Sequence, residues 1–128
     1  MIIFDSSCWL EYFAGSDASI PFSDLIQKVD EIIVPTIVLQ EVFRKLITLY
    51  PEKEALFAIA QMEEGFIAEH TRGIALEAAR YSSLYKLPLA DSIIYATAMQ
   101  FNATIYTLDH HFEGLPNVKY FEKRKKNE

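Results

Sequence analysis

Short apolar runs that alternate with helical segments constrain the fold of this chain more than any other feature. A continuous apolar run is typical of a strand that is buried on both faces of a parallel sheet. Strands that alternate with helices in turn predict a parallel sheet with helices on both faces. We therefore expect an α/β fold of three layers, α/β/α, around a central, mostly parallel sheet of about five strands. The expected strands cover residues 2–4, 32–34, 66–68, 104–108 and 118–121.

The spacing of apolar side chains between these runs predicts the helices. Ser6 or Ser7 can cap the first helix, which stops at Gly15 and is followed by a turn over residues 16–21. Further helices are expected over residues 22–29, 36–50, 51–62, 72–85 and 88–101. We find no internal repeat and expect one domain over residues 1–122, with a basic, flexible tail over residues 123–128.

The helix expected over residues 88–101 is apolar on nearly every side, which predicts that it is buried. Pro88 suits its first position, and Asn102 suits the position just past its end. Asp91 lies in its first turn. An acid there can complement the helix dipole and cap free N–H groups, or it can belong to a functional site.

Three more acids favour a functional site. Asp5 and Asp109 follow the first and fourth expected strands, and Glu41 lies near the start of the helix after the second strand. Because parallel strands end at one edge of a sheet and the following helices start there, these acids and Asp91 are expected at one edge.

Four neighbouring carboxylates need compensation, either by protons or by cations. A site made only of oxygen ligands suits a hard cation such as Mg²⁺ or Mn²⁺. Such an ion can lower the pKa of a bound water and stabilise charge on phosphorus, which predicts metal-assisted hydrolysis of phosphodiester bonds.

Several polar residues could support this site. Ser6 and Thr107 flank the acids and could hold waters or phosphate oxygens, or could simply be a local cap and a strand residue. His110 and His111 could be metal ligands or exposed loop residues. Basic residues that could contact a nucleic-acid backbone, or simply face solvent, are Arg44, Lys45, Arg72, Arg80 and Lys86.

Charge and composition exclude some classes of function. A net charge of −6 argues against broad binding of nucleic acid through a basic surface. No apolar run approaches the roughly 20 residues of a membrane span, and the N-terminus predicts a strand and no signal peptide. Cys8 is the only cysteine, so we expect no internal disulfide, a buried thiol rather than a nucleophile, and a reducing, cytoplasmic setting.

Four motifs carry a resemblance to a known family. They are Asp5-Ser6-Ser7 after the first strand, Val38-Leu39-Gln40-Glu41-Val42, Leu89-Ala90-Asp91-Ser92-Ile93-Ile94-Tyr95-Ala96, and Thr107-Leu108-Asp109-His110-His111-Phe112. In this order and spacing the chain resembles PIN-domain ribonucleases, specifically VapC-type toxins of toxin–antitoxin pairs, over nearly its whole length.

The resemblance implies that Asp5, Glu41, Asp91 and Asp109 are catalytic metal ligands, with Ser6 and Thr107 as supporting polar residues. It further implies a Mg²⁺- or Mn²⁺-dependent endoribonuclease that acts on tRNA or rRNA, forms a homodimer, and is silenced by a cognate antitoxin covering the active site. Where some relatives carry a further acid, this chain has His110 and His111. The many apolar residues of the helices from Thr36 to Met62 suggest that this hairpin pairs two subunits.

Three other functions are compatible with acids at a sheet edge. A DNA nuclease of related type is one, although such relatives have inserted helical regions. A phospho-acceptor module is another, but it would have an acidic pair after the first strand, where this chain has serines, and a lysine after a late strand. A non-catalytic binding module that keeps a relic site is the third.

Overall fold

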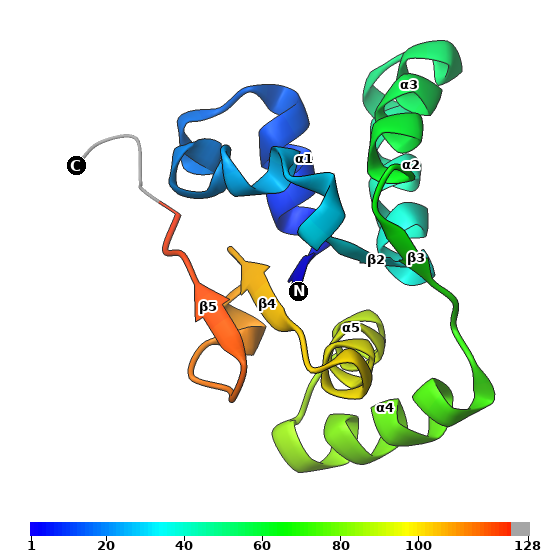
Figure 1. Ribbon diagram of the computed structural model, residues 1–128, viewed down its shortest axis with the longest axis vertical. Coiled ribbons are helices and arrows are strands. Elements are labelled where there is room, and N and C mark those ends of the chain that lie inside the picture. Colours follow the sequence, from blue (N-terminus) through cyan, green and yellow to red (C-terminus); the bar gives the residue numbers. More distant parts are fainter. Residues whose placement is uncertain (124–128) are drawn as a thin grey trace.

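The five expected strands are all present in the structure, a computed structural model that describes residues 1–123 (Figure 1). They are β1 (Ile2–Phe4), β2 (Ile33–Pro35), β3 (Phe66–Ala68), β4 (Thr104–Thr107) and β5 (Val118–Tyr120). Three of them differ from the prediction by one residue at their ends. β2 begins at Ile33 rather than Ile32 and includes Pro35, while Leu108 and Phe121 lie just beyond their strands. The tail expected over residues 123–128 lies outside the described residues, except for Lys123.

Every strand pair is parallel, so the expected α/β fold with a parallel central sheet is confirmed. β1, β4 and β5 form one sheet in the order β1-β4-β5, and β2 and β3 form a second. A single parallel bridge between Ile2 and Ile32 links the two. No hydrogen-bonded sheet of the described part holds all five strands, because strands of three or four residues offer few groups for a continuous ladder.

Five α-helices accompany the strands. They are α1 (Ser6–Ala14), α2 (Thr36–Leu49), α3 (Glu52–Met62), α4 (Arg72–Tyr85) and α5 (Leu89–Phe101). The prediction that Ser6 or Ser7 caps the first helix is wrong. Asp5 is the N-cap of α1, and its side chain accepts a hydrogen bond from the N–H of Cys8. Pro88 likewise precedes α5 as its N-cap, while Asn102 adopts the predicted left-handed conformation at its end.

The segment between α1 and β2 differs most from the prediction. The turn expected over residues 16–21 and the helix expected over 22–29 are replaced by three 3₁₀ helices, η1 (Asp17–Phe22), η2 (Leu25–Gln27) and η3 (Val29–Glu31). Phe22 and Ile26 are buried as their spacing suggested, so the segment is anchored at these points. Pro21 lacks the N–H for an α-helical bond, which favours short, tight turns here.

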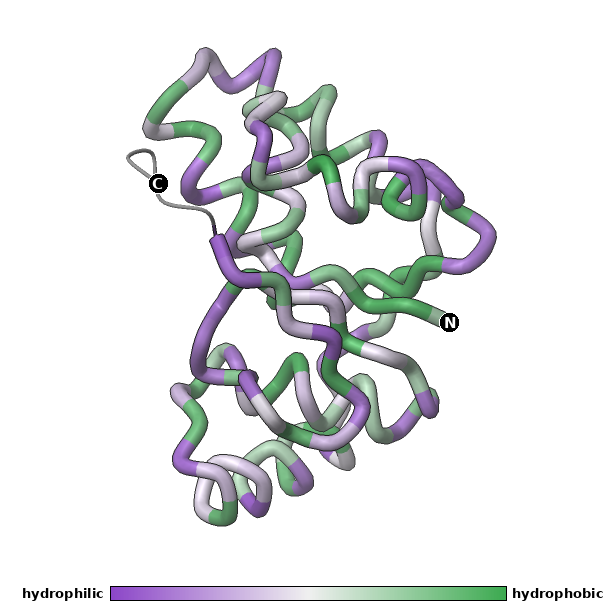
Figure 2. Tube along the Cα trace, turned by 90° about the vertical axis from the view of Figure 1, so that its left-hand side faces the viewer, coloured by the Kyte–Doolittle hydropathy of each residue, from purple (hydrophilic) through white to green (hydrophobic). Residues whose placement is uncertain are grey.

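Helix α5 is the buried helix that its sequence predicts. Every residue from Ser92 to Ala98 is buried, and α4 packs along it on the outer side (Figure 1). The ring of Tyr95 contacts those of Tyr81 and Tyr85 of α4, with centroids 4.9 and 5.5 Å away. Hydrophobic residues line the part of the backbone that passes through the centre of the molecule, where the strands lie (Figure 2). No helix of the described residues is both long and apolar enough to cross a membrane.

Candidate active site

The carboxyl ends of β1 and β4 are adjacent, because the two strands pair in parallel. Asp5 follows β1 and Asp109 follows β4, each as the N-cap of the helix that comes next. Asp91 lies in the first turn of α5, and Glu41 lies in α2, which contacts both α1 and α5. Parallel pairing of β1 and β4 brings Asp5 and Asp109 together, and the contacts of α2 with α1 and α5 bring Glu41 and Asp91 to the same region of the fold.

Asp5 is buried, with only 2% of its surface exposed, and two hydroxyls hold its carboxylate. Ser7 Oγ donates to Oδ1 and Thr107 Oγ1 donates to Oδ2, each at 2.5 Å. Burial raises the pKa of Asp5 to about 6, although these hydrogen bonds oppose the rise. Thr107, which the sequence analysis expected to be a supporting residue, therefore contacts Asp5 directly.

Electrostatic effects show that the four carboxylates are neighbours. Burial, together with the negative charges of Asp109, Asp5 and Glu41, raises the pKa of Asp91 to about 7, although the charge of His111 opposes the rise. The charge of Asp109 also raises the pKa of Asp5 and of Glu41. The site concentrates negative charge that a cation would neutralise.

Glu41 has its own hydroxyl partner. Ser6 Oγ donates to Glu41 Oε1 at 3.1 Å. Burial raises the pKa of Glu41, while this hydrogen bond and the positive charge of Arg44 lower it. Arg44 is therefore close enough to the site to influence it.

Ser7 is a supporting residue that the sequence did not single out. Its hydroxyl donates to Asp5 and accepts the N–H of Leu108 at 3.1 Å, so it ties the end of β1 to the chain after β4. The only sequence signal was its place in Asp5-Ser6-Ser7, where two adjacent serines on a helix point in different directions.

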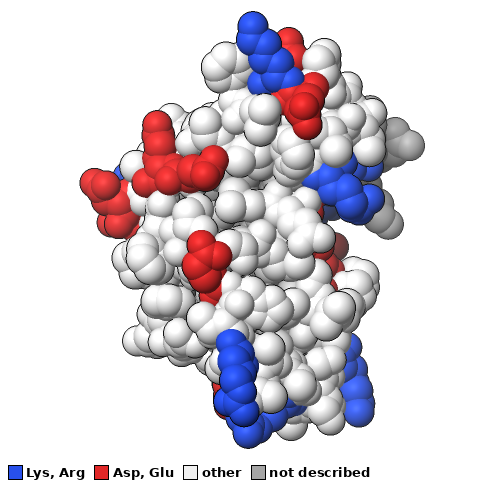
Figure 3. All heavy atoms as spheres, turned by 90° about the vertical axis from the view of Figure 1, so that its right-hand side faces the viewer, with Lys and Arg blue, Asp and Glu red and all other residues white. Residues whose placement is uncertain are grey.

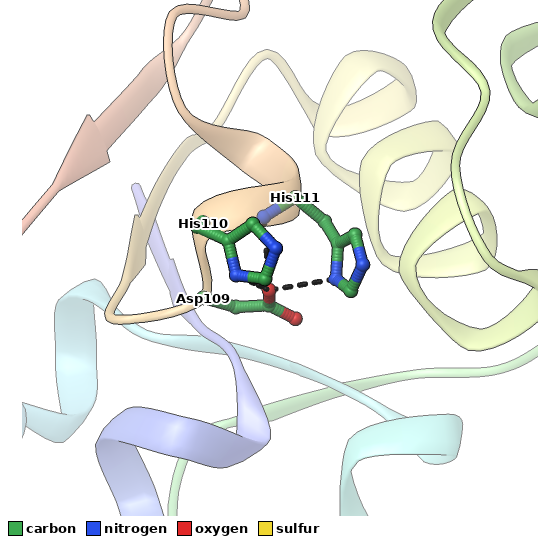
Figure 4. Close-up of side chains that lie close together, drawn as sticks. All are labelled: Asp109, His110 and His111. Atoms are coloured by element: carbon green, nitrogen blue, oxygen red, sulfur yellow. Dashed lines mark hydrogen bonds and ion pairs between the residues drawn. The ribbon is translucent and has the colours of Figure 1, made fainter.

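His111 is a residue whose role the sequence left open, between metal ligand and exposed loop residue. Its Nδ1 lies 2.8 Å from Asp109 Oδ1 and 3.5 Å from Asp91 Oδ2. Figure 4 shows its ring beside the Asp109 carboxylate, on the side of α5. His110 lies farther out, with Nδ1 3.9 Å from the same oxygen. Donor atoms of Asp109, His110 and His111 lie within 4.8 Å of one another.

The basic residues that the sequence singled out lie in different surroundings. Arg44 acts on Glu41, whereas Lys45 lines a groove between α1 and α2. Arg80 pairs with Glu77 of its own helix. On the face of the molecule drawn in Figure 3, Lys and Arg side chains form separate patches with no continuous basic surface. This distribution agrees with the acidic net charge.

Cys8 lies next to the site but is unsuited to chemistry. It is fully buried, and its Sγ donates to the carbonyl oxygen of Tyr106 at 3.3 Å. Burial and the charge of Asp5 raise the pKa of its thiol far above the usual range. Since the thiolate is the nucleophilic form, the expectation of a buried, unreactive cysteine agrees with this environment.

A comparison with models of protein families matches residues 2–117 to the PIN domain. The chain belongs to the PIN-domain family. PIN domains are a family of nucleases. A search of curated proteins finds no match.

Solved structures similar to this PIN domain include toxin–antitoxin proteins. A toxin–antitoxin complex from Klebsiella pneumoniae has a TM-score of 0.79 at 22% identity, over 93% of this chain and 96% of that one. VapC20 from Mycobacterium tuberculosis, described as a toxin that cleaves the sarcin–ricin loop, has a TM-score of 0.73 at 15% identity, over 91% and 95%. VapBC2 from Rickettsia felis, bound to a promoter DNA fragment, has a TM-score of 0.72 at 17% identity, over 95% and 100%. At these identities the likeness establishes the fold.

The ligand types of this PIN domain suit a divalent cation, and the donor atoms that lie closest together are those of Asp109, His110 and His111. Its four carboxylates offer several oxygens, and burial and mutual repulsion make their shared negative charge costly without a cation. Hard divalent cations bind such oxygen sets. The site thus has the ligand types and the charge for metal-assisted chemistry on an anionic substrate.

Proposed function

We propose that this PIN domain is a Mg²⁺- or Mn²⁺-dependent endoribonuclease and the toxin of a VapBC-type toxin–antitoxin pair. The observation that carries the proposal is the mutual influence of Asp5, Glu41, Asp91 and Asp109, whose charges act on one another across four elements. Because a phosphodiester and the four carboxylates are all negatively charged, hydrolysis at such a cluster requires a cation. Membership of a nuclease family indicates the class of reaction.

In this proposal the four carboxylates hold the metal. When bound, Mg²⁺ or Mn²⁺ lowers the pKa of a water and offsets negative charge on the phosphate. Ser7 and Thr107 fix both oxygens of Asp5, and Ser6 fixes one oxygen of Glu41, so the ligands are oriented before the metal arrives. In this proposal Arg44, on the helix that carries Glu41, contacts a substrate phosphate.

The proposed substrate is RNA, with tRNA or rRNA as the candidates. The VapC20 neighbour is described as a toxin that cleaves the sarcin–ricin loop. This activity is that of VapC20, and it supports the proposed class of substrate. The absence of a broad basic face on the side drawn in Figure 3 favours recognition of a particular RNA over sequence-blind binding.

The proposed partner is a cognate antitoxin. A groove of about 350 Å³ lies between α1 and α2 and reaches Ser7 and Leu108, which are the neighbours of site residues. Its apolar lining comes from Leu10, Ala14, Leu46, Leu49 and Tyr50. An apolar helix seated in this groove would lie beside the acids and could block them. We further propose a homodimer and a cytoplasmic location.

The proposal is tested by RNA cleavage with the purified chain, with and without Mg²⁺ or Mn²⁺. We expect metal-dependent cleavage that Asp5→Asn and Asp91→Asn abolish while the circular dichroism spectrum stays unchanged. Asp24→Asn is the matched control, because Asp24 is exposed and its side chain makes no cap hydrogen bond. Full activity of either site variant would refute the proposal. Preferential cleavage of DNA would refute RNA as the substrate and indicate a DNA nuclease.

A further inference from the structure

We propose that His111 is a metal ligand, which gives the acidic site one nitrogen donor and makes it select Mn²⁺ over Mg²⁺. The inference rests on the proposed function, because it assigns a further ligand to the same cation. Its basis is the position of one imidazole between two carboxylates from different elements, Asp91 of α5 and Asp109 after β4.

The distances suit ligands of one ion. Adjacent ligands of an octahedral Mg²⁺- or Mn²⁺-sized ion, each about 2.1 Å from the metal, lie about 3 Å apart. His111 Nδ1 is 2.8 Å from Asp109 Oδ1 and 3.5 Å from Asp91 Oδ2. The nitrogen can therefore neighbour each of these oxygens in a coordination shell after small side-chain movements.

The backbone that carries this imidazole is held in place. The N–H of His111 donates to Asp109 Oδ1 at 2.9 Å, so the backbone turns back toward the acid that its ring also contacts. The next residue, Phe112, is fully buried and anchors the 3₁₀ helix η4 (His110–Phe112) to the core. His111 is thereby aimed at the carboxylates, while His110 stacks on its outer side with ring centroids 4.4 Å apart (Figure 4).

A nitrogen donor changes which metal the site prefers. Carboxylate and water ligands suit Mg²⁺ and Mn²⁺ alike, whereas imidazole binds transition-metal ions and contributes little to Mg²⁺. His111 is half-exposed, with 45% of its side-chain surface accessible, so it can adjust to an ion without disturbing the core. The four acids alone would give a site with weak discrimination, and His111 adds the selectivity.

The experiment is pulsed electron paramagnetic resonance of Mn²⁺ bound to the whole chain, which detects the nuclear spin of a directly coordinated ¹⁴N. We expect ¹⁴N modulation in the wild type and in His110→Gln, the matched control, and none in His111→Gln. Calorimetric titration should show that His111→Gln lowers the ratio of Mn²⁺ to Mg²⁺ affinity by about tenfold or more. His111→Asp should lose the ¹⁴N signal while still binding Mg²⁺.

Asp91→Asn separates the two proposals. If Mn²⁺ binds the wild type, is lost in Asp91→Asn, and shows no ¹⁴N modulation, the metal site stands and the role of His111 is refuted. An affinity ratio unchanged in His111→Gln refutes it as well. If no Mn²⁺ binds to the wild type at all, both the proposed function and this inference fail.

Discussion

At the scale of single residues, the state of Asp5 depends on a balance between burial and hydrogen bonding. Burial favours the neutral acid, whereas Ser7 and Thr107 each donate a hydrogen bond that favours the carboxylate. A metal ligand must be ionised, so these hydroxyls lower the cost of preparing Asp5 for a cation. Ser7 and Thr107 therefore help to set the pH range in which the site can bind a cation.

Thr107→Val tests this balance, because it keeps the shape of the side chain and removes the hydroxyl, which donates to Asp5 and also accepts the N–H of Asp109 at 2.8 Å. A hydrogen bond to a charged group contributes about 1.5–3 kcal/mol, so we expect the pKa of Asp5 to rise by about 1–2 units above its value of about 6. Carbon-detected nuclear magnetic resonance of the metal-free chain measures this pKa directly.

Thr97→Val is the control for Thr107→Val. Thr97 is equally buried, but its hydroxyl donates within α5, to the carbonyl oxygen of Ile93 at 2.7 Å. It should leave the pKa of Asp5 unchanged. A rise of the same size in both variants would mean that general loosening of the core, and not the lost hydrogen bond, controls Asp5.

At the scale of elements, the approach of α3 to β2 depends on Gly65. A Cβ at this position would lie 3.1 Å from the carbonyl oxygen of Ile32 and 3.3 Å from Val34 Cγ2. That oxygen also accepts the N–H of Phe66 at the start of β3, so it cannot easily move. The close packing of the second sheet against the turn after α3 therefore requires a residue without a side chain.

Gly65→Ala is expected to destabilise the fold by about 1–3 kcal/mol, the usual cost of overpacking. Gly73→Ala is the matched control, since its nearest contact would be Thr71 Oγ1 at 3.8 Å and it lies in the first turn of α4. There alanine should be neutral or stabilise by up to about 1 kcal/mol through its helix propensity. Urea unfolding compares the two, and equal stabilities would contradict the packing argument.

The elements also show what the sequence could predict. The strands and α5 were predictable because their apolar patterns are local, and the convergence of Asp5 and Asp109 followed from parallel pairing. The 3₁₀ helices between Asp17 and Glu31 were not predicted, because the same apolar spacing fits an α-helix and only tertiary packing decides. The contacts of Ser7 and His111 depend on side-chain directions set by segments about 100 and 20 residues away, which no local pattern encodes.

At the scale of the whole molecule, the acidic site links stability to pH and to metal. The pKa of Asp5 is 3.8 when unperturbed and about 6 in the folded chain, and that of Asp91 rises to about 7. Between pH 4 and 7 the folded state keeps protons that the unfolded state has lost. The metal-free protein therefore loses stability as the pH rises through this range, by about 3 kcal/mol from Asp5 alone.

Divalent metal should reverse this trend, because it binds the ionised carboxylates. At a concentration of 100 times Kd it adds about 2.7 kcal/mol, which raises Tm by on the order of 10 °C. We expect this increase with Mn²⁺ at pH 7.5, a much smaller one at pH 5, and none in Asp91→Asn. Thermal unfolding with Mn²⁺ or with a chelator measures it, and equal increases at both pH values would contradict the linkage.

The molecule also exposes apolar side chains on the hairpin of α2 and α3, which we expect to pair two subunits. Ile47, Leu56 and Phe57 are exposed by 44, 52 and 68%, and exposed apolar residues grouped on one part of a surface mark contact sites. Leu56 and Phe57 lie outside the groove lined by Leu49 and Tyr50, so a dimer here would leave that groove open to an antitoxin.

Sedimentation equilibrium at high protein concentration tests the dimer. We expect the wild type to have twice the chain mass of 14.7 kDa, and Leu56→Asp with Phe57→Asp to have the mass of one chain. Ile20→Asp is the control, because Ile20 is 67% exposed in η1, outside the hairpin, and its substitution should leave the dimer intact. A wild type that stays at 14.7 kDa would remove the dimer, and a dimer that survives the hairpin variant would place the interface elsewhere.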